Sequence, residues 1–189
     1  MSIFEYVVAA LLLVVGLGIT QLLSDLADTF RGRQRINLHW IPLTWVGLVF
    51  VWQMQFIWGI FELNELIKSW TAVNFIILLF MALLLFVAGA LVVPKSSDDE
   101  SWNVWEQFLQ DGRWSLVCLS CFFFLAFFTN PVLFEIPLLL PANMMDFVLG
   151  TLLIIVQFAR SKMIWAVTTI AFTLLTMIAL VLLSPAAYQ

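Results

Sequence analysis

Long apolar segments separated by short groups of charged residues dominate the pattern of the chain. Division of the sequence at its charged residues leaves six uncharged intervals, at 6–24, 36–61, 69–94, 114–134, 147–159 and 163–189. An α-helix rises 1.5 Å per residue, so about 20 residues cross a hydrocarbon core about 30 Å thick. Five of the intervals reach or nearly reach this length. The pattern therefore predicts an all-α integral membrane protein.

The fifth interval is short because Asp146 and Arg160 enclose only residues 147–159. The apolar sequence continues upstream, however, as IPLLLPANMM. A helix that begins near Ala142, with Asn143 as its N-cap and Asp146 at its third position, places the Asp146 carboxylate among the free N–H groups of the first turn. Such a helix has about 17 residues, the lower limit for a span. We therefore expect six transmembrane helices, and five spans with a re-entrant fifth segment are the alternative.

The longest polar stretch, residues 94–114, carries an amphipathic pattern. Apolar residues recur there at helical spacing, with polar residues around the rest of the wheel; they are Trp102, Trp105, Phe108 and Leu109. This spacing predicts a short interfacial helix on the cytoplasmic leaflet that leads through Gly112 into the next span. A helix that docks onto a partner protein is the alternative.

These elements fill the chain, so residues 1–189 are expected to form a single transmembrane domain. The six spans are expected at about 4–30, 40–62, 70–93, 114–133, 142–159 and 163–184, and the interfacial helix at about 101–111. Composition agrees, because 63% of the residues are hydrophobic and 11% are charged, against about 45–50% and 25% in soluble domains. A soluble fold of this size cannot bury that much apolar surface.

Basic residues set the expected orientation. With six spans, one side of the membrane carries seven of the eight basic residues: Arg31, Arg33, Arg35, Lys95, Arg113, Arg160 and Lys162. Only Lys68 falls on the other side. Positively charged loops stay in the cytoplasm, so both termini are expected outside, in the periplasm. Arg31, Arg33 and Arg35, with His39 and Trp40 beside them, are the expected topology and lipid-headgroup anchors.

Catalytic and metal-binding patterns are sparse. Cys118 and Cys121 form a CLSC motif, but a zinc site needs further ligands, and His39 is the single histidine. No nucleophile with its base or glycine-rich phosphate loop is visible, so neither enzymatic activity nor a cofactor nor a metal is expected. A net charge of −4 argues against nucleic-acid binding. A proton-sensing role for His39 is the sharper alternative to an anchor or helix cap.

Polar residues at membrane depth suggest a functional path. Thr20, Gln21, Gln53 and Gln55 lie within the first two spans, and Asp25 and Asp28 follow at the cytoplasmic end of the first. These six residues are the candidates for a polar path and its mouth, which indicates a small channel or passive solute pathway. Hydrogen bonding between helices is the structural alternative. The second functional class is a scaffold, accessory subunit or stress or defence component that acts by assembly with a partner.

The loop TNPVLFEIPLLLPANMMD, residues 129–146, is apolar although it is expected outside the membrane. An apolar loop needs cover, either from the bilayer or from another subunit. We therefore expect a homo-oligomer or a subunit of a membrane complex, in addition to contact with the lipid bilayer.

One resemblance covers most of the chain. Its motifs are a glycine-bearing first helix, an arginine-rich turn into Leu38, His39 and Trp40 with Pro42 after it, a glutamine-rich aromatic helix that ends in Glu-Leu, and LVVP before an acidic amphipathic segment. Together these resemble a set of uncharacterised small polytopic inner-membrane proteins of bacteria. The resemblance implies a bacterial inner membrane and carries no activity or site.

The charge pattern yields a topology prediction. A periplasmic reporter enzyme fused after Gln189 is expected to be active, because six crossings return the chain to the side where it began. The same reporter inserted in the loop at 94–100 is expected to be silent. An inactive fusion after Gln189 with an active cytoplasmic reporter at the same place would contradict six spans.

Overall fold

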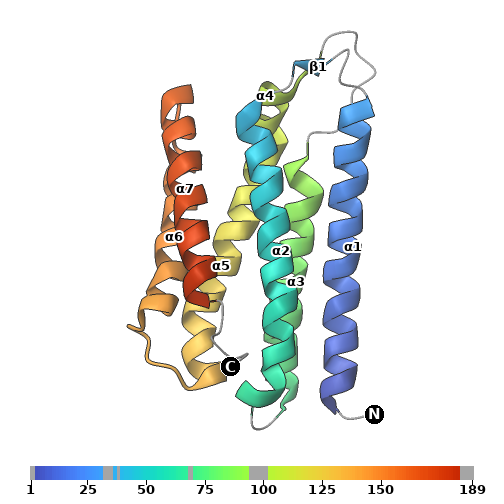
Figure 1. The fold of residues 1–189 in the computed structure, drawn as a ribbon, viewed down its shortest axis with the longest axis vertical. Coiled ribbons are helices and arrows are strands. Elements are labelled where there is room, and N and C mark those ends of the chain that lie inside the picture. The colour runs from blue at the N-terminus through green and yellow to red at the C-terminus, as the bar shows by residue number, and fades with distance from the viewer. Residues whose placement is uncertain (1–2, 32–35, 38, 68–69, 94–101, 184–189) are drawn as a thin grey trace.

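The computed structural model describes residues 3–31, 36–37, 39–67, 70–93 and 102–183. It is a bundle of long helices that run alternately up and down (Figure 1). The helices are α1 (Ile3–Arg31), α2 (Trp40–Leu66), α3 (Ala72–Val92), α4 (Val104–Gln107), the π-helical turn η1 (Phe108–Gly112), α5 (Arg113–Phe134), α6 (Pro141–Gln157) and α7 (Lys162–Leu183). The predicted all-α class is confirmed; two strands of two residues each are the exception in the described chain.

Five helices are long and apolar enough to cross a membrane. They are α1, α2, α3, the continuous run from α4 to α5, and α7. The sixth, α6, has 17 residues and is the short one, as the spacing of Asp146 and Arg160 indicated. The chain therefore contains five helices of spanning length and one apolar helix at the lower limit.

We call one end of the bundle the basic end: there α1, α3 and α6 finish, and α2, α4 and α7 begin (Figure 1). The basic residues of the described chain gather at this end, namely Arg31, Arg113, Arg160 and Lys162. Two connections also meet there, because β1 (Ile36–Asn37) pairs in parallel with β2 (Trp102–Asn103). The basic residues that the structure describes are thus on one side of the apolar bundle.

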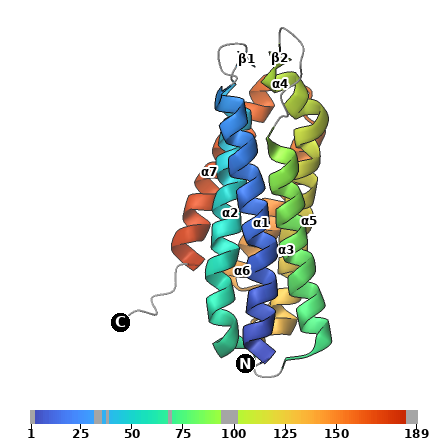
Figure 2. The same cartoon turned by 90° about the vertical axis from the view of Figure 1, so that its right-hand side faces the viewer.

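The helices form an open arrangement around α3. This helix packs against α1, α2 and α5; α5 also packs against α6, and α7 lies on α2 and α6 (Figure 2). Contact between α2 and α5 is slight. Consequently a space remains between these two helices, with α3 on one side and α6 on the other.

Gln53 of α2 occupies the junction of α1, α2 and α3. Its side chain is fully buried (0% exposed), and its Nε2 donates a hydrogen bond of 3.0 Å to the carbonyl oxygen of Leu85 in α3. Gly18 of α1 and Gly89 of α3 leave room for this amide, since a Cβ added at Gly89 would lie 2.6 Å from Gln53 Nε2. The glycines are required here for the close approach of the helices.

Two tryptophans join α2 to α7 with the same seven-residue spacing on both helices. Trp45 Nε1 donates to Thr169 Oγ1 at 3.1 Å, and Trp52 Nε1 donates to Thr176 Oγ1 at 3.3 Å. Both contacts advance in the same direction along the two helices, so α2 and α7 run parallel. These deep tryptophans therefore pack inside the bundle.

The amphipathic segment differs from the separate helix expected at about 101–111. It begins as α4, only four residues long, and continues without a break through the π-helical turn into α5. Its apolar residues Trp105 and Phe108 are buried, and both contact Trp165 of α7 edge-on, with ring centroids 6.0 and 5.7 Å apart. Amphipathic spacing predicts an apolar face, and protein covers much of that face here.

The glycine junction gives a prediction on stability. Gly89→Ala is expected to lower the free energy of unfolding by about 1–2 kcal/mol, because the new methyl group displaces the Gln53 amide from Leu85. Gly47→Ala is the matched control: nothing lies within 4 Å of its added Cβ, so it is expected to be neutral or to stabilise by up to about 1 kcal/mol through helix propensity. Unfolding in mixed micelles measures both. Equal stability of the two variants would contradict the close junction.

Candidate functional site

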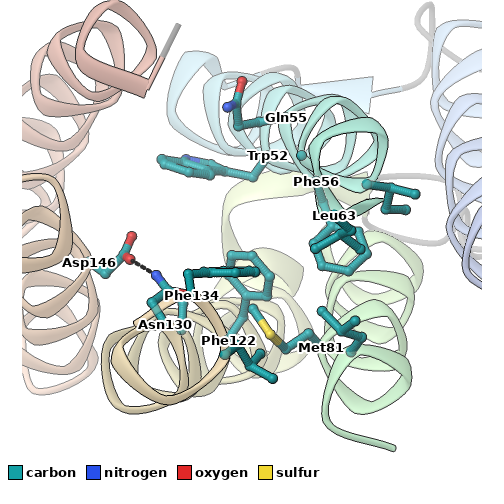
Figure 3. Close-up of a pocket in the computed structure, with 14 residues that line it drawn as sticks. Trp52, Gln55, Phe56, Leu63, Met81, Phe122, Asn130, Phe134 and Asp146 are labelled. Atoms are coloured by element: carbon teal, nitrogen blue, oxygen red, sulfur yellow. Dashed lines mark hydrogen bonds between the residues drawn. The ribbon is translucent and has the colours of Figure 1, made fainter. Parts of the chain in front are cut away.

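A cavity of about 160 Å³ lies between α2, α3, α5 and α6, where α2 and α5 are held apart (Figure 3). Its walls are mostly apolar and come from all four helices. Three polar side chains also line it: Gln55 of α2, Asn130 of α5 and Asp146 of α6. The combination of a mostly apolar cavity with a few polar groups is typical of small-molecule sites.

A proline inside α5 lies beside the polar part of this cavity. Pro131 lies inside α5 and has no backbone N–H, so it leaves the carbonyl group of Phe127 without its usual helical partner. Asn143 of α6 supplies one: its Nδ2 donates to Phe127 O at 3.1 Å, and also to Leu138 O at 3.0 Å. Asn143 thereby fastens α6 and the preceding loop to α5, and its side chain is 1% exposed.

Asp146 and Asn130 extend this network to the cavity. Asn130 Nδ2 donates to Asp146 Oδ2 at 3.1 Å and to Asn143 Oδ1 at 3.4 Å (Figure 3). Asp146 is 9% exposed. Within the described part of the chain, no basic side chain forms an ion pair with its carboxyl group. The cavity therefore carries a carboxyl group that is removed from water and held by an amide.

The expected N-cap of this helix was wrong, although the expected start near Ala142 lies one residue from the observed start. The sequence suggested Asn143 as the N-cap and Asp146 at the third position, but α6 begins at Pro141 with Leu140 as the N-cap and no side-chain cap. Proline suits the first helical position because its missing N–H is not needed there. Because the N-cap lies three residues before Asn143, Asp146 falls in the second turn of α6, where its carboxyl group accepts a hydrogen bond from Asn130 of α5.

The residues proposed for a polar path lie on different faces. Thr20 is exposed and donates to the backbone oxygen of Gly16, and Gln21 is exposed and donates to both carboxylate oxygens of Asp25 at 2.9 Å. Gln53 is buried at the three-helix junction. Gln55 lines the cavity. Of the six path candidates, Gln55 is therefore the one that lines the cavity. Asp25 and Asp28 lie near the end of α1, toward the basic end of the bundle.

The expected anchors lie at the basic end. Arg31 is exposed and forms an ion pair of 2.9 Å with Asp28, and Trp40 is exposed. Arg33 and Arg35 lie outside the described residues.

His39 is the N-cap of α2, because its Nδ1 accepts a hydrogen bond of 3.3 Å from Ile41 N. Its ring also packs against the Trp105 ring, with the two ring centroids 4.9 Å apart. Burial, with a smaller contribution from the charge of Lys162, lowers the pKa of His39. The neutral ring suits the cap, since protonation of Nδ1 removes the acceptor.

Sequence reasoning passed over the pairing of Asn130 with Asp146. The sequence analysis places Asp146 only in the first turn of its helix and assigns no partner to Asn130. The signal was present in the Asn-Pro step at 130–131 and in Asn143 and Asp146, which fall one helical turn apart. Their meeting still depends on how α5 packs against α6.

Metal ligands do not gather in the described residues, where no group of three His, Cys, Asp or Glu side chains lies together. Cys118 and Cys121 are free thiols on α5. Comparison of the chain with protein families, with curated proteins and with solved structures finds no match. The proposals below therefore rest on the geometry of the chain itself.

The Asn143 bridge gives a prediction. Asn143→Leu is expected to lower the free energy of unfolding by about 1–3 kcal/mol, because it leaves the Phe127 carbonyl group buried without a partner. Pro131→Ala restores an N–H to the helix, so the same Asn143→Leu change is expected to cost less in that background. Unfolding of the wild type, the two single variants and the double variant measures this difference. A cost of Asn143→Leu that is the same in both backgrounds would contradict the bridge.

Proposed function

We propose that the chain crosses a bacterial inner membrane six times, with α6 as the sixth span and both termini in the periplasm. The alternation of the helices and the collection of basic residues at one end support this arrangement. The 17 residues of α6 cover about 25 Å, so this span is expected to tilt little or to thin the bilayer locally. In this orientation the cavity extends toward the periplasmic side, because its residues Leu63, Phe134 and Asp146 lie near the helix ends opposite the basic end.

Within this frame, we propose that the cavity is the solute-binding site of a small passive pathway. The single observation that carries the proposal is the buried carboxyl group of Asp146, held by the half-buried Asn130, at the side of a mostly apolar cavity. Polar groups at membrane depth are costly and mark solute or ion paths when they face a cavity. The proposed path thus passes between α2 and α5, and Gln55 is the polar residue that α2 contributes to it.

Among the α2 residues that line the cavity, Trp52 lies nearest the basic end. Its ring meets Phe123 of α5 edge-on, with centroids 4.7 Å apart, and its indole N–H is fixed to Thr176. Passage toward the cytoplasm requires Trp52 and Phe123 to separate. The described conformation is therefore the closed state of the proposed pathway.

A second candidate function, assembly with another copy or a partner subunit, is supported by the loop between α5 and α6. Leu138, Leu139 and Leu140 of this loop are exposed, Leu139 at 76%. In the proposed orientation these leucines lie at the periplasmic side, where a second subunit would cover them. A scaffold or accessory role follows if assembly is found without solute passage.

The pathway is tested with purified protein in liposomes, by the rates at which choline, glycerol and K⁺ cross. For whichever of the three solutes crosses, Gln55→Leu is expected to lower the rate of passage about two- to tenfold. This is the effect of one lost neutral hydrogen bond. Trp52→Ala is expected to raise the rate of passage, because it removes the indole ring that closes the cavity toward the basic end. Gln21→Leu is the matched control, since this glutamine lies outside the cavity lining, and it is expected to leave the rate unchanged.

Liposomes that pass none of the three solutes, together with a Leu139→Cys variant that crosslinks between copies, would favour the assembly role. Equal effects of Gln55→Leu and Gln21→Leu would contradict the placement of the path in this cavity.

A further inference from the structure

We propose that the cavity between α2, α3, α5 and α6 binds a small organic ammonium ion that carries an aromatic or branched apolar substituent. This inference deepens the proposed function and rests on it for the solute, although binding is measured independently of passage. Three features of the cavity support it: the carboxyl group, the aromatic walls and the volume.

The carboxyl group of Asp146 supplies the charge complement. It is 9% exposed and lines the cavity, and Asn130 fixes its Oδ2 from α5. In Figure 3 this carboxyl group faces the space between α2 and α5. No basic side chain of the described chain pairs with it. A buried carboxylate is favourable when it is paired, so a cation that enters the cavity supplies the missing partner.

Aromatic rings form much of the remaining wall. Trp52 and Phe56 come from α2, and Phe122 and Phe134 from α5. Ring faces attract ammonium groups, and the attraction grows when water is excluded. Phe56 and Phe122 meet edge-on across the gap between the two helices, with centroids 6.0 Å apart. A carboxylate beside aromatic rings selects an organic cation over both a hydrated metal ion and a neutral solute.

The volume of the cavity limits the size of the cation. About 160 Å³ accommodates one aromatic ring with a short aminoalkyl chain. The other lining residues, among them Ile60, Leu63 and Met81, are apolar and contact the substituent. Gln55 adds one uncharged polar group to the wall. The site therefore fits an amphiphilic amine with a single charge.

Calorimetry on the full chain in detergent tests the charge requirement with two probes of the same shape, phenethylamine and 2-phenylethanol. The wild type is expected to bind the amine at least about tenfold more tightly than the alcohol, because only the ammonium group pairs with Asp146. Equal affinities for the two probes would overturn the proposal.

Variants assign the preference to the cavity. Asp146→Asn keeps the size and hydrogen bonding of the side chain and is expected to abolish the preference for the amine. Asp25→Asn, on the outside of α1, is the matched control and is expected to retain it. Phe56→Leu keeps an apolar wall without the ring face and is expected to reduce the preference, which tests the site even if Asp146→Asn fails to fold. A preference that persists in both cavity variants would overturn the assignment.

Failure of this inference is distinguishable from failure of the pathway. Glycerol passage that depends on Gln55, with equal binding of the amine and the alcohol, would retain the pathway and overturn the ammonium site. If calorimetry shows tight amine binding that depends on Asp146 while the liposomes pass no solute, the ammonium site would be retained and the pathway overturned.

Discussion

The interior of this bundle depends on one constraint: the lipid offers no hydrogen bonds, so a polar side chain buried between membrane helices depends on protein groups for its partners. Four side chains meet it by donation to the backbone carbonyl of another helix. Gln53 donates to Leu85, Ser115 to Ala88, Ser120 to Gly150 and Asn143 to Phe127. These bonds join α2 to α3, α5 to α3, and α5 to α6 in both directions. Each is worth only about 0.6 kcal/mol on average in a membrane, so their main effect is to fix which faces meet.

The positions of the helices were open to prediction from the sequence, since charge spacing and apolar length mark where a span ends. The helix expected at 4–30 runs from Ile3 to Arg31, and the one expected at 70–93 runs from Ala72 to Val92. The partners of the amphipathic segment were not predictable, because its spacing is the same whether lipid or protein covers it. Trp105 meets the side chains of His39 and Trp165, which come from distant parts of the chain.

The candidate site was less predictable than the fold. Gln53 and Gln55 were grouped as lining one path, yet residues two apart on a helix point about 200° from each other. The structure accordingly places Gln53 against α1 and α3 and Gln55 in the cavity beside α5. Helical geometry alone was enough to separate them. The pairing of Asn130 with Asp146, in contrast, depends on the register of α5 against α6 and on the start of α6 at Pro141.

The same hydrogen bonds explain why a cavity exists between α2 and α5. Bonds and ring contacts hold α2 to α3 and α7, and hold α5 to α3 and α6. Across the gap, the side-chain contacts among the described residues are aromatic edges, Trp52 with Phe123 and Phe56 with Phe122. Edge-on ring pairs contribute about 0.5–1.5 kcal/mol beyond the apolar area that they bury, so these two contacts help to hold the helices together across the gap. The α2–α5 boundary is therefore held in part by these ring contacts, and it borders the cavity that Asn130 and Asp146 line.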